Sequence, residues 1–107
     1  MRQYSVADAL LRTSLRIDGD NAAAHQNLGN ALLAENQAEA AVQEYETAAR
    51  LAPHDAVIHY NWGNGLLRLG RREDAAKELR AALAIDPGLQ PARALLQALA
   101  GAAGRSE

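Results

Sequence analysis

NLGN at residues 27–30 and NWGN at residues 61–64 differ at one position and lie 34 residues apart. The surrounding sequence repeats with the same period. Aligning residues 22–55 with residues 56–89 gives twelve identities without a gap, where composition alone would give about four. The identical pairs are Ala22/Ala56, His25/His59, Asn27/Asn61, Gly29/Gly63, Asn30/Asn64, Leu32/Leu66, Leu33/Leu67, Glu39/Glu73, Ala41/Ala75, Glu44/Glu78, Ala48/Ala82 and Pro53/Pro87. The chain therefore contains a duplicated structural unit.

Composition indicates that this unit is helical. Ala and Leu, the strongest helix formers, supply most of the apolar residues, and the β-branched residues that favour strands are scarce. A chain of 107 residues is long enough for one core and too short for two independent ones. We therefore expect a single all-α domain.

Each unit contains two helical stretches separated by a break. The first stretches cover residues 22–35 and 56–69, and the second cover residues 38–51 and 72–85. Asn36 and Gly70 stand at the breaks, where a left-handed residue ends a helix and only Gly or Asn adopts that conformation cheaply. The second stretches run into Pro53 and Pro87, which cannot continue a helix. Each unit is therefore predicted to be a helical hairpin.

The residues that mark these hairpins resemble the tetratricopeptide repeat, which has the same 34-residue period. Matches to its pattern of Trp, Leu-Gly, Tyr, Ala, Phe and Pro are Leu28, Gly29, Ala41, the aromatic Tyr45 and Pro53 in the first unit, and Gly63, Ala75 and Pro87 in the second. Departures from the pattern are His25 and His59 for Trp, Trp62 for Leu, Leu32 and Leu66 for Tyr, and Leu79 for Phe. Each departure keeps a bulky side chain that can fill the space between helices.

The resemblance extends beyond the two full repeats and implies about six helices in an α–α solenoid, a segment of a right-handed superhelix. Counting by the period gives a half repeat at residues 4–18, full repeats at 22–55 and 56–89, a terminal first-type helix at 90–100 and a flexible tail at 101–107. Leucines at both ends lack the polar caps that repeat proteins need. Our hypothesis is that the chain is a segment of a longer array of repeats, or that it forms a homodimer by pairing through its terminal helices.

The first helix of each unit is expected to carry the binding surface. With 100° per residue, one side of this helix faces its partner helix and the other remains open. The residues predicted on or beside the open side are Gln26, Asn27, Asn30 and Leu33 in the first unit, and Val57, Tyr60, Asn61, Asn64, Leu67 and Arg68 in the second. The resemblance implies that stacked hairpins join these faces into a concave groove that holds an extended peptide or a helix.

Two rows of Asn, Asn27 with Asn61 and Asn30 with Asn64, lie on this surface. A side-chain amide both donates and accepts hydrogen bonds, so such rows can hold a peptide backbone of any sequence. The alternative is that the amides serve local helix contacts or solvent. Both interpretations remain open on the sequence alone.

A known version of the groove grips the C-terminal carboxylate of chaperone clients with Lys and Arg beside such Asn residues. Asn30 and Asn61 match the Asn positions of that clamp. Gln26, Pro91 and Leu95 occupy the places of its cations. The sequence therefore argues against binding of an acidic chaperone tail.

No pattern of residues indicates an enzyme, a metal site or a cofactor. His25 and His59 share one repeat position, where the family places a packing Trp, so a structural role explains both. There is no Cys and no HExxH spacing for zinc, no Gly-rich phosphate loop, and no nucleophile beside a base. The second-helix carboxylates are expected to face solvent; they are Glu44, Glu46, Glu73 and Asp74.

Charge and hydropathy exclude other classes of partner. The formal net charge of −2 does not suit a nucleic-acid backbone, and no apolar run is long enough for a membrane span. The sequence shows no signal peptide, so we expect a cytoplasmic protein. Because Arg outnumbers Lys ten to one and Ala is abundant, the composition suggests a bacterial source.

We expect an interaction module that binds a peptide or partner protein in the groove and has no catalytic residues. Two alternatives remain. One is the substrate-recruiting arm of a larger enzyme, because paired Asn-Leu-Gly-Asn repeats are similar to the arm of peptide-modifying glycosyltransferases. The other is a self-assembling oligomer that joins through its uncapped terminal helices.

Overall fold

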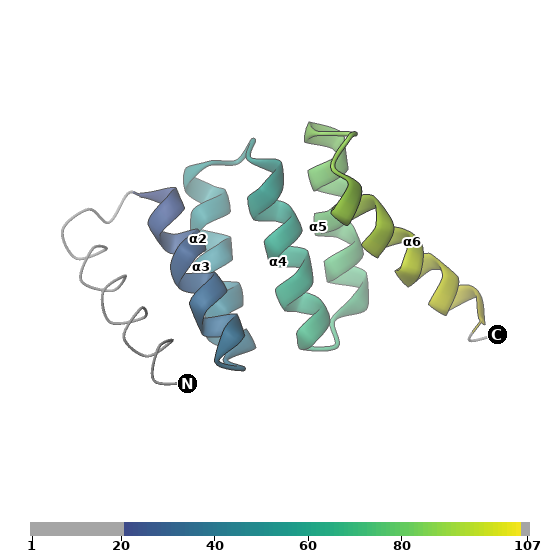
Figure 1. Cartoon of the computed structure of the whole chain (residues 1–107), viewed down its shortest axis with the longest axis horizontal. Coiled ribbons are helices and arrows are strands. Elements are labelled where there is room, and N and C mark those ends of the chain that lie inside the picture. The colour runs from purple at the N-terminus through teal and green to yellow at the C-terminus, as the bar shows by residue number, and fades with distance from the viewer. Residues whose placement is uncertain (1–20, 106–107) are drawn as a thin grey trace. The chain divides into compact units, whose positions relative to one another are not determined.

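The computed structural model describes residues 21–105 and has five α-helices in that range (Figure 1). The helices are α2 (Ala22–Ala34), α3 (Ala38–Leu51), α4 (Ala56–Arg68), α5 (Arg72–Ile85) and α6 (Gln90–Arg105). No strand occurs within these residues, in agreement with the predicted all-α class. The half repeat predicted at residues 4–18 lies outside the described range.

The chain divides into two compact units between His54 and Asp55. The described part of unit 1 is the hairpin of α2 and α3. Unit 2 contains the hairpin of α4 and α5, followed by α6, which packs against α5. Within each hairpin the two helices lie side by side and run antiparallel (Figure 1). These are the two hairpins that the 34-residue period predicts.

Hydrogen bonds at the ends of the first helices explain where these helices begin and stop. The carboxamide of Asn21 and the carboxylate of Asp55 accept backbone N–H bonds from the first turns of α2 and α4, each at 3.0 Å. At the other ends, Asn36 and Gly70 have φ angles of 63° and 78°. This left-handed residue lets the next backbone N–H bond back to the helix, from Gln37 to the carbonyl of Leu32 at 2.8 Å. The predicted break is therefore confirmed in both units.

The second helices end where proline follows. The last helix-type bonds are donated by the N–H groups of Ala52 and Asp86, each at 2.8 Å from a carbonyl one turn earlier. Pro53 and Pro87 come next and have no N–H to continue the series. The predicted ends of α3 and α5 agree with the structure.

The last helix is longer than expected. The sequence predicts a helix over residues 90–100 and a flexible tail over 101–107, whereas α6 continues to Arg105. Gly101 and Gly104 each cost up to about 1 kcal/mol of helix propensity, but Ala102 and Ala103 between them are the best helix formers. The favourable pair carries the helix past the predicted end.

The core of unit 1 explains the glycine in NLGN. Leu28 and Leu32 of α2 are 1% exposed, and Tyr45 of α3 is fully buried. A Cβ atom at Gly29 would lie 2.7 Å from Cε1 of Tyr45, closer than carbon atoms can approach. The Tyr45 ring therefore packs against the backbone of α2 at the one position that has no side chain.

Unit 2 repeats this arrangement with different side chains. Leu79 occupies the position of Tyr45 and is fully buried, and a Cβ atom at Gly63 would lie 3.0 Å from its Cγ. Ala92 at the start of α6 is also fully buried and joins a core cluster with Leu79. Three leucines of α6 are partly buried against this cluster; they are Leu95, Leu96 and Leu99. The core of unit 2 is thus shared by three helices.

Candidate functional site

The open side of α2 presents two amides. Asn27 and Asn30 are exposed and Gln26 is half-buried. Leu33, predicted on the same side, is 8% exposed, since a large apolar side chain gains stability when it leaves water. The surface that α2 offers to a ligand is therefore polar, and Leu33 contributes little to it.

The open side of α4 is less exposed and more varied. Asn61 and Asn64 are half-buried, as is Leu67. Tyr60 is half-buried because it packs partly against the core cluster of unit 2. At the two ends of the helix Val57 is 44% exposed and Arg68 is exposed. The face of α4 thus combines amides with apolar, aromatic and cationic side chains.

Asn30 is held by a residue of the core. The buried Tyr45 hydroxyl donates a hydrogen bond of 2.5 Å to Oδ1 of Asn30. The carbonyl oxygen of this amide is therefore engaged within the hairpin, while the two Nδ2 donors take no part in that bond. The sequence left open whether the amides serve local contacts or a ligand, and Asn30 makes the local contact while staying exposed.

Asn64, the equivalent residue of unit 2, has a different neighbour. The position of Tyr45 is occupied by Leu79, which has no hydroxyl to donate. The Asn64 amide therefore lacks the internal bond that fixes Asn30. Neither the donor nor the acceptor of this amide is therefore engaged by Leu79.

Each hairpin also contains a His–Glu pair that the sequence analysis missed. Nδ1 of His25 lies 2.8 Å from Oε1 of Glu44, and Nδ1 of His59 lies 2.9 Å from Oε1 of Glu78. The expectation that Glu44 faces solvent is wrong, because a largely buried imidazole needs a hydrogen-bond partner and Glu44 supplies it. The signal was present, since both residues recur together with the 34-residue period.

The two imidazoles have a structural role in joining the helices of each hairpin. Both His side chains are 14% exposed, and the ring of His59 also stacks on Trp62, with centroids 6.2 Å apart.

Among residues 21–105, no group of three or more His, Asp and Glu side chains is placed to hold a metal ion. None of the described helices is long and apolar enough to cross a membrane.

Comparison with known proteins agrees with this geometry. A family model described as TPR repeat matches residues 29–70, and one described as tetratricopeptide repeat matches residues 56–89. Together the two matches span both hairpins except the first turns of α2. No curated protein sequence matches the chain.

Several solved structures share the fold at low sequence identity. The first TPR of Spaghetti (RPAP3), bound to the HSP90 peptide SRMEEVD, has a TM-score of 0.92 and 19% identity, over 95% of this chain and 81% of that one. The Arabidopsis OM64 TPR domain has a TM-score of 0.89 and 22% identity, over 94% of this chain and 83% of that one. YrrB, described as a TPR protein with an unusual peptide-binding site, has a TM-score of 0.85 and 22% identity, over 90% of this chain and 50% of that one. These likenesses show the fold. The two family matches, which together cover residues 29–89, show that the chain belongs to the tetratricopeptide repeat family.

Proposed function

We propose that this protein is an interaction module that binds peptide segments of partner proteins, and that the open side of α2 in unit 1 and the open side of α4 in unit 2 each provide a peptide-binding face. The observation that carries the proposal is the recurrence of accessible amides at matching repeat positions. These amide faces consist of Asn27 and Asn30 on α2, and Asn61 and Asn64 on α4. Two of the similar structures support the proposal, since the first TPR of Spaghetti (RPAP3) is bound to a peptide and YrrB has an unusual peptide-binding site.

The two amide faces would recognise a peptide by different bonds. Asn30 can donate from Nδ2 to a peptide carbonyl, whereas Asn64 can bond the N–H and the C=O of the ligand backbone together. Each such hydrogen bond contributes about 0.5–1.5 kcal/mol net. Because backbone groups are the same in every peptide, sequence preference would come from the side chains of α4 around Asn64, such as Val57 and Tyr60.

The proposed recognition does not depend on a carboxylate at the end of the ligand. Gln26, Pro91 and Leu95 stand where carboxylate-binding relatives are expected to carry cations, and Leu95 is partly buried in the core of unit 2. We therefore expect affinity to change little with salt, because neutral hydrogen bonds are screened much less than exposed ion pairs. A peptide that ends in Met-Glu-Glu-Val-Asp is the carboxylate-bearing ligand with which the affinity and its salt dependence are compared.

The experiment selects peptides from a random library displayed on phage and measures their affinity for the purified chain by fluorescence anisotropy. Asn64→Ala should weaken binding about fivefold to thirtyfold, the loss of one or two hydrogen bonds. Gln43→Ala, which removes an exposed amide from α3, is the matched control and should bind like the parent chain. Circular dichroism should show unchanged helix content in both variants.

A double-mutant cycle tests whether one peptide contacts both faces. If Asn30→Ala and Asn64→Ala each weaken binding of the same peptide, both helices take part. If the double variant binds every selected peptide as tightly as the parent chain does, the amide faces are not the binding site and the proposal fails.

A further inference from the structure

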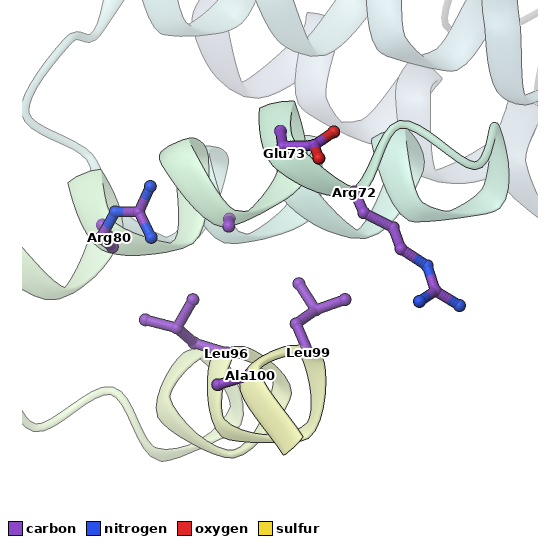
Figure 2. A pocket seen from close by; sticks show the side chains of 7 residues that line it. Arg72, Glu73, Arg80, Leu96, Leu99 and Ala100 are labelled. Atoms are coloured by element: carbon purple, nitrogen blue, oxygen red, sulfur yellow. The ribbon is translucent and has the colours of Figure 1, made fainter. Parts of the chain in front are cut away.

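A second surface, separate from the amide faces, lies between α5 and α6 within unit 2. A groove of about 390 Å³ lies there. Figure 2 shows the side chains that line it. The lining residues are Arg72, Glu73, Ala76 and Arg80 of α5, and Leu96, Leu99 and Ala100 of α6. None of them belongs to α4, so a ligand in this groove would not occupy Asn61 or Asn64.

The floor of the groove is apolar. Leu96 and Leu99 rise from α6 toward α5 in Figure 2 and are only half-buried, although both touch the core cluster of unit 2. Ala76 and Ala100 are small and leave room beside the two leucines. An apolar surface of this kind gains stability when another apolar surface covers it.

The repeat indicates which shape would cover it. Counting back two periods, Leu96 corresponds to Leu28 and Ala100 to Leu32. In the hairpin of α2 and α3 both of those leucines are 1% exposed, whereas Leu96 is only half-buried and Ala100 is exposed. The agreement in register is supported by Ala92, which is buried like its counterpart Ala24. The positions that are left open on α6 are thus ones that a helical hairpin buries, so the complementary shape is a helix.

Charge around the groove indicates the polar part of the ligand. Arg72 and Arg80 are exposed and lie toward opposite ends of the groove (Figure 2). They are eight positions apart on α5, which is about 12 Å along the helix axis. Within the described part of the chain neither guanidinium forms an ion pair, and Glu73 is the one acid among the lining residues. The groove therefore favours negative charge although the chain as a whole has a formal charge of −2.

We propose that the groove between α5 and α6 binds an acidic amphipathic helix of a partner protein. The apolar stripe of that helix would cover Leu96 and Leu99. Its acidic residues, about eight positions apart, would lie beside Arg72 and Arg80, because equal spacing along two aligned helices brings the charges together. This site is independent of the proposed peptide-binding function of α2 and α4.

The test uses two synthetic peptides of about 16 residues, enough for four helical turns. Both have Leu and Ala along one face. One has Glu residues eight positions apart beside that face, and the other has Lys at the same places. Isothermal titration calorimetry with the whole chain at low salt should show tighter binding of the Glu peptide.

Charge reversal gives the decisive comparison. The double variant Arg72→Glu with Arg80→Glu should weaken binding of the Glu peptide about tenfold or more and strengthen binding of the Lys peptide, because two attractions become repulsions. Lys77→Glu is the matched control, since Lys77 is exposed on the same helix and does not line the groove. It should leave the preference unchanged. The neutral pair Arg72→Gln with Arg80→Gln gives the same comparison if the reversed variant loses helix content.

Several outcomes would overturn the proposal. The proposal is wrong if the two peptides bind equally or if neither binds. It is also wrong if Lys77→Glu has the same effect as the Arg72 and Arg80 variants, because the charges beside the groove would then not determine binding. If adding the peptide changed the NMR chemical shifts of backbone amides in α4 alone, the ligand would bind outside the groove between α5 and α6. Sedimentation showing self-association that disappears in the Arg72 and Arg80 variants would identify a second copy of the chain as the occupant instead.

Discussion

The contact between Gly29 and Tyr45 predicts that Gly29→Ala destabilises the protein, against the usual preference of helices for Ala. In an open helix interior this substitution gains about 0.5–1 kcal/mol. At Gly29 the new Cβ would lie 2.7 Å from Cε1, 2.9 Å from Cδ1 and 3.1 Å from Cζ of Tyr45. The ring would have to move, and overpacking of this kind costs about 1–3 kcal/mol.

The Tyr45 ring has little freedom to move away from the added methyl group. It is fully buried, and its hydroxyl is bonded to Asn30. We therefore expect a cost near the upper end of the overpacking range and a net loss of about 1–2 kcal/mol in the free energy of unfolding. Urea denaturation followed by circular dichroism measures this loss.

The same substitution at Gly101 is the control. Nothing lies within 4 Å of a Cβ atom there, so Gly101→Ala should be neutral or stabilising by up to about 1 kcal/mol. Adding Tyr45→Leu, the residue that α5 uses at this position, should remove part of the penalty of Gly29→Ala, because the ring is gone. An unfolding free energy for Gly29→Ala equal to or above that of the parent chain would refute the packing argument.

Three further substitutions test other contacts by the same denaturation assay. Glu44→Ala should lower the free energy of unfolding by about 1–2 kcal/mol, because Nδ1 of the largely buried His25 side chain loses its partner. Glu46→Ala, on the exposed side of α3, should change it by no more than about 0.5 kcal/mol. Equal losses in the two variants would show that the His25–Glu44 pair does not stabilise the protein. Gly70→Ala should cost about 1 kcal/mol from backbone strain alone, since φ is 78° and no atom obstructs the methyl group, and an unchanged stability would contradict this. Tyr45→Phe should cost about 0.5–1.5 kcal/mol through loss of the bond to Asn30 while the ring still fills the core; a larger loss would point to other bonds of this hydroxyl.

The sequence predicted the parts of the fold that depend on local rules. The 34-residue period located both hairpins, Asn36 and Gly70 marked the ends of the first helices, and Pro53 and Pro87 followed the ends of the second. These features require only the conformation of neighbouring residues. The structure reproduces them because the same local preferences operate in the folded chain.

Contacts between helices were predicted less well. The bond between His25 and Glu44 joins residues 19 positions apart, and helical periodicity alone gives no reason to pair them. The bond from Tyr45 to Asn30 was missed for the same reason. The peptide-binding role of the amide faces stays a prediction, because a face pattern shows where an amide lies and not what it binds.

The two hairpins differ in which helix carries an aromatic side chain at two equivalent repeat positions, and this difference reaches the proposed binding surface. Unit 1 has Leu28 on the first helix and Tyr45 on the second, whereas unit 2 has Trp62 on the first helix and Leu79 on the second. The exchange roughly conserves the volume of the pair, so it is tolerated as a packing change.

The exchange does not conserve hydrogen bonding. Moving the aromatic ring to the first helix removes the hydroxyl that Tyr45 directs to Asn30, so Asn64 has no such bond, and it places an indole beside His59. A substitution within the core thus changes what an amide on the open side of the helix can offer to a ligand. On this reasoning Asn64 should contribute more to peptide binding than Asn30, and a larger loss of affinity for Asn30→Ala than for Asn64→Ala would show that the internal bond to Tyr45 strengthens the amide as a donor.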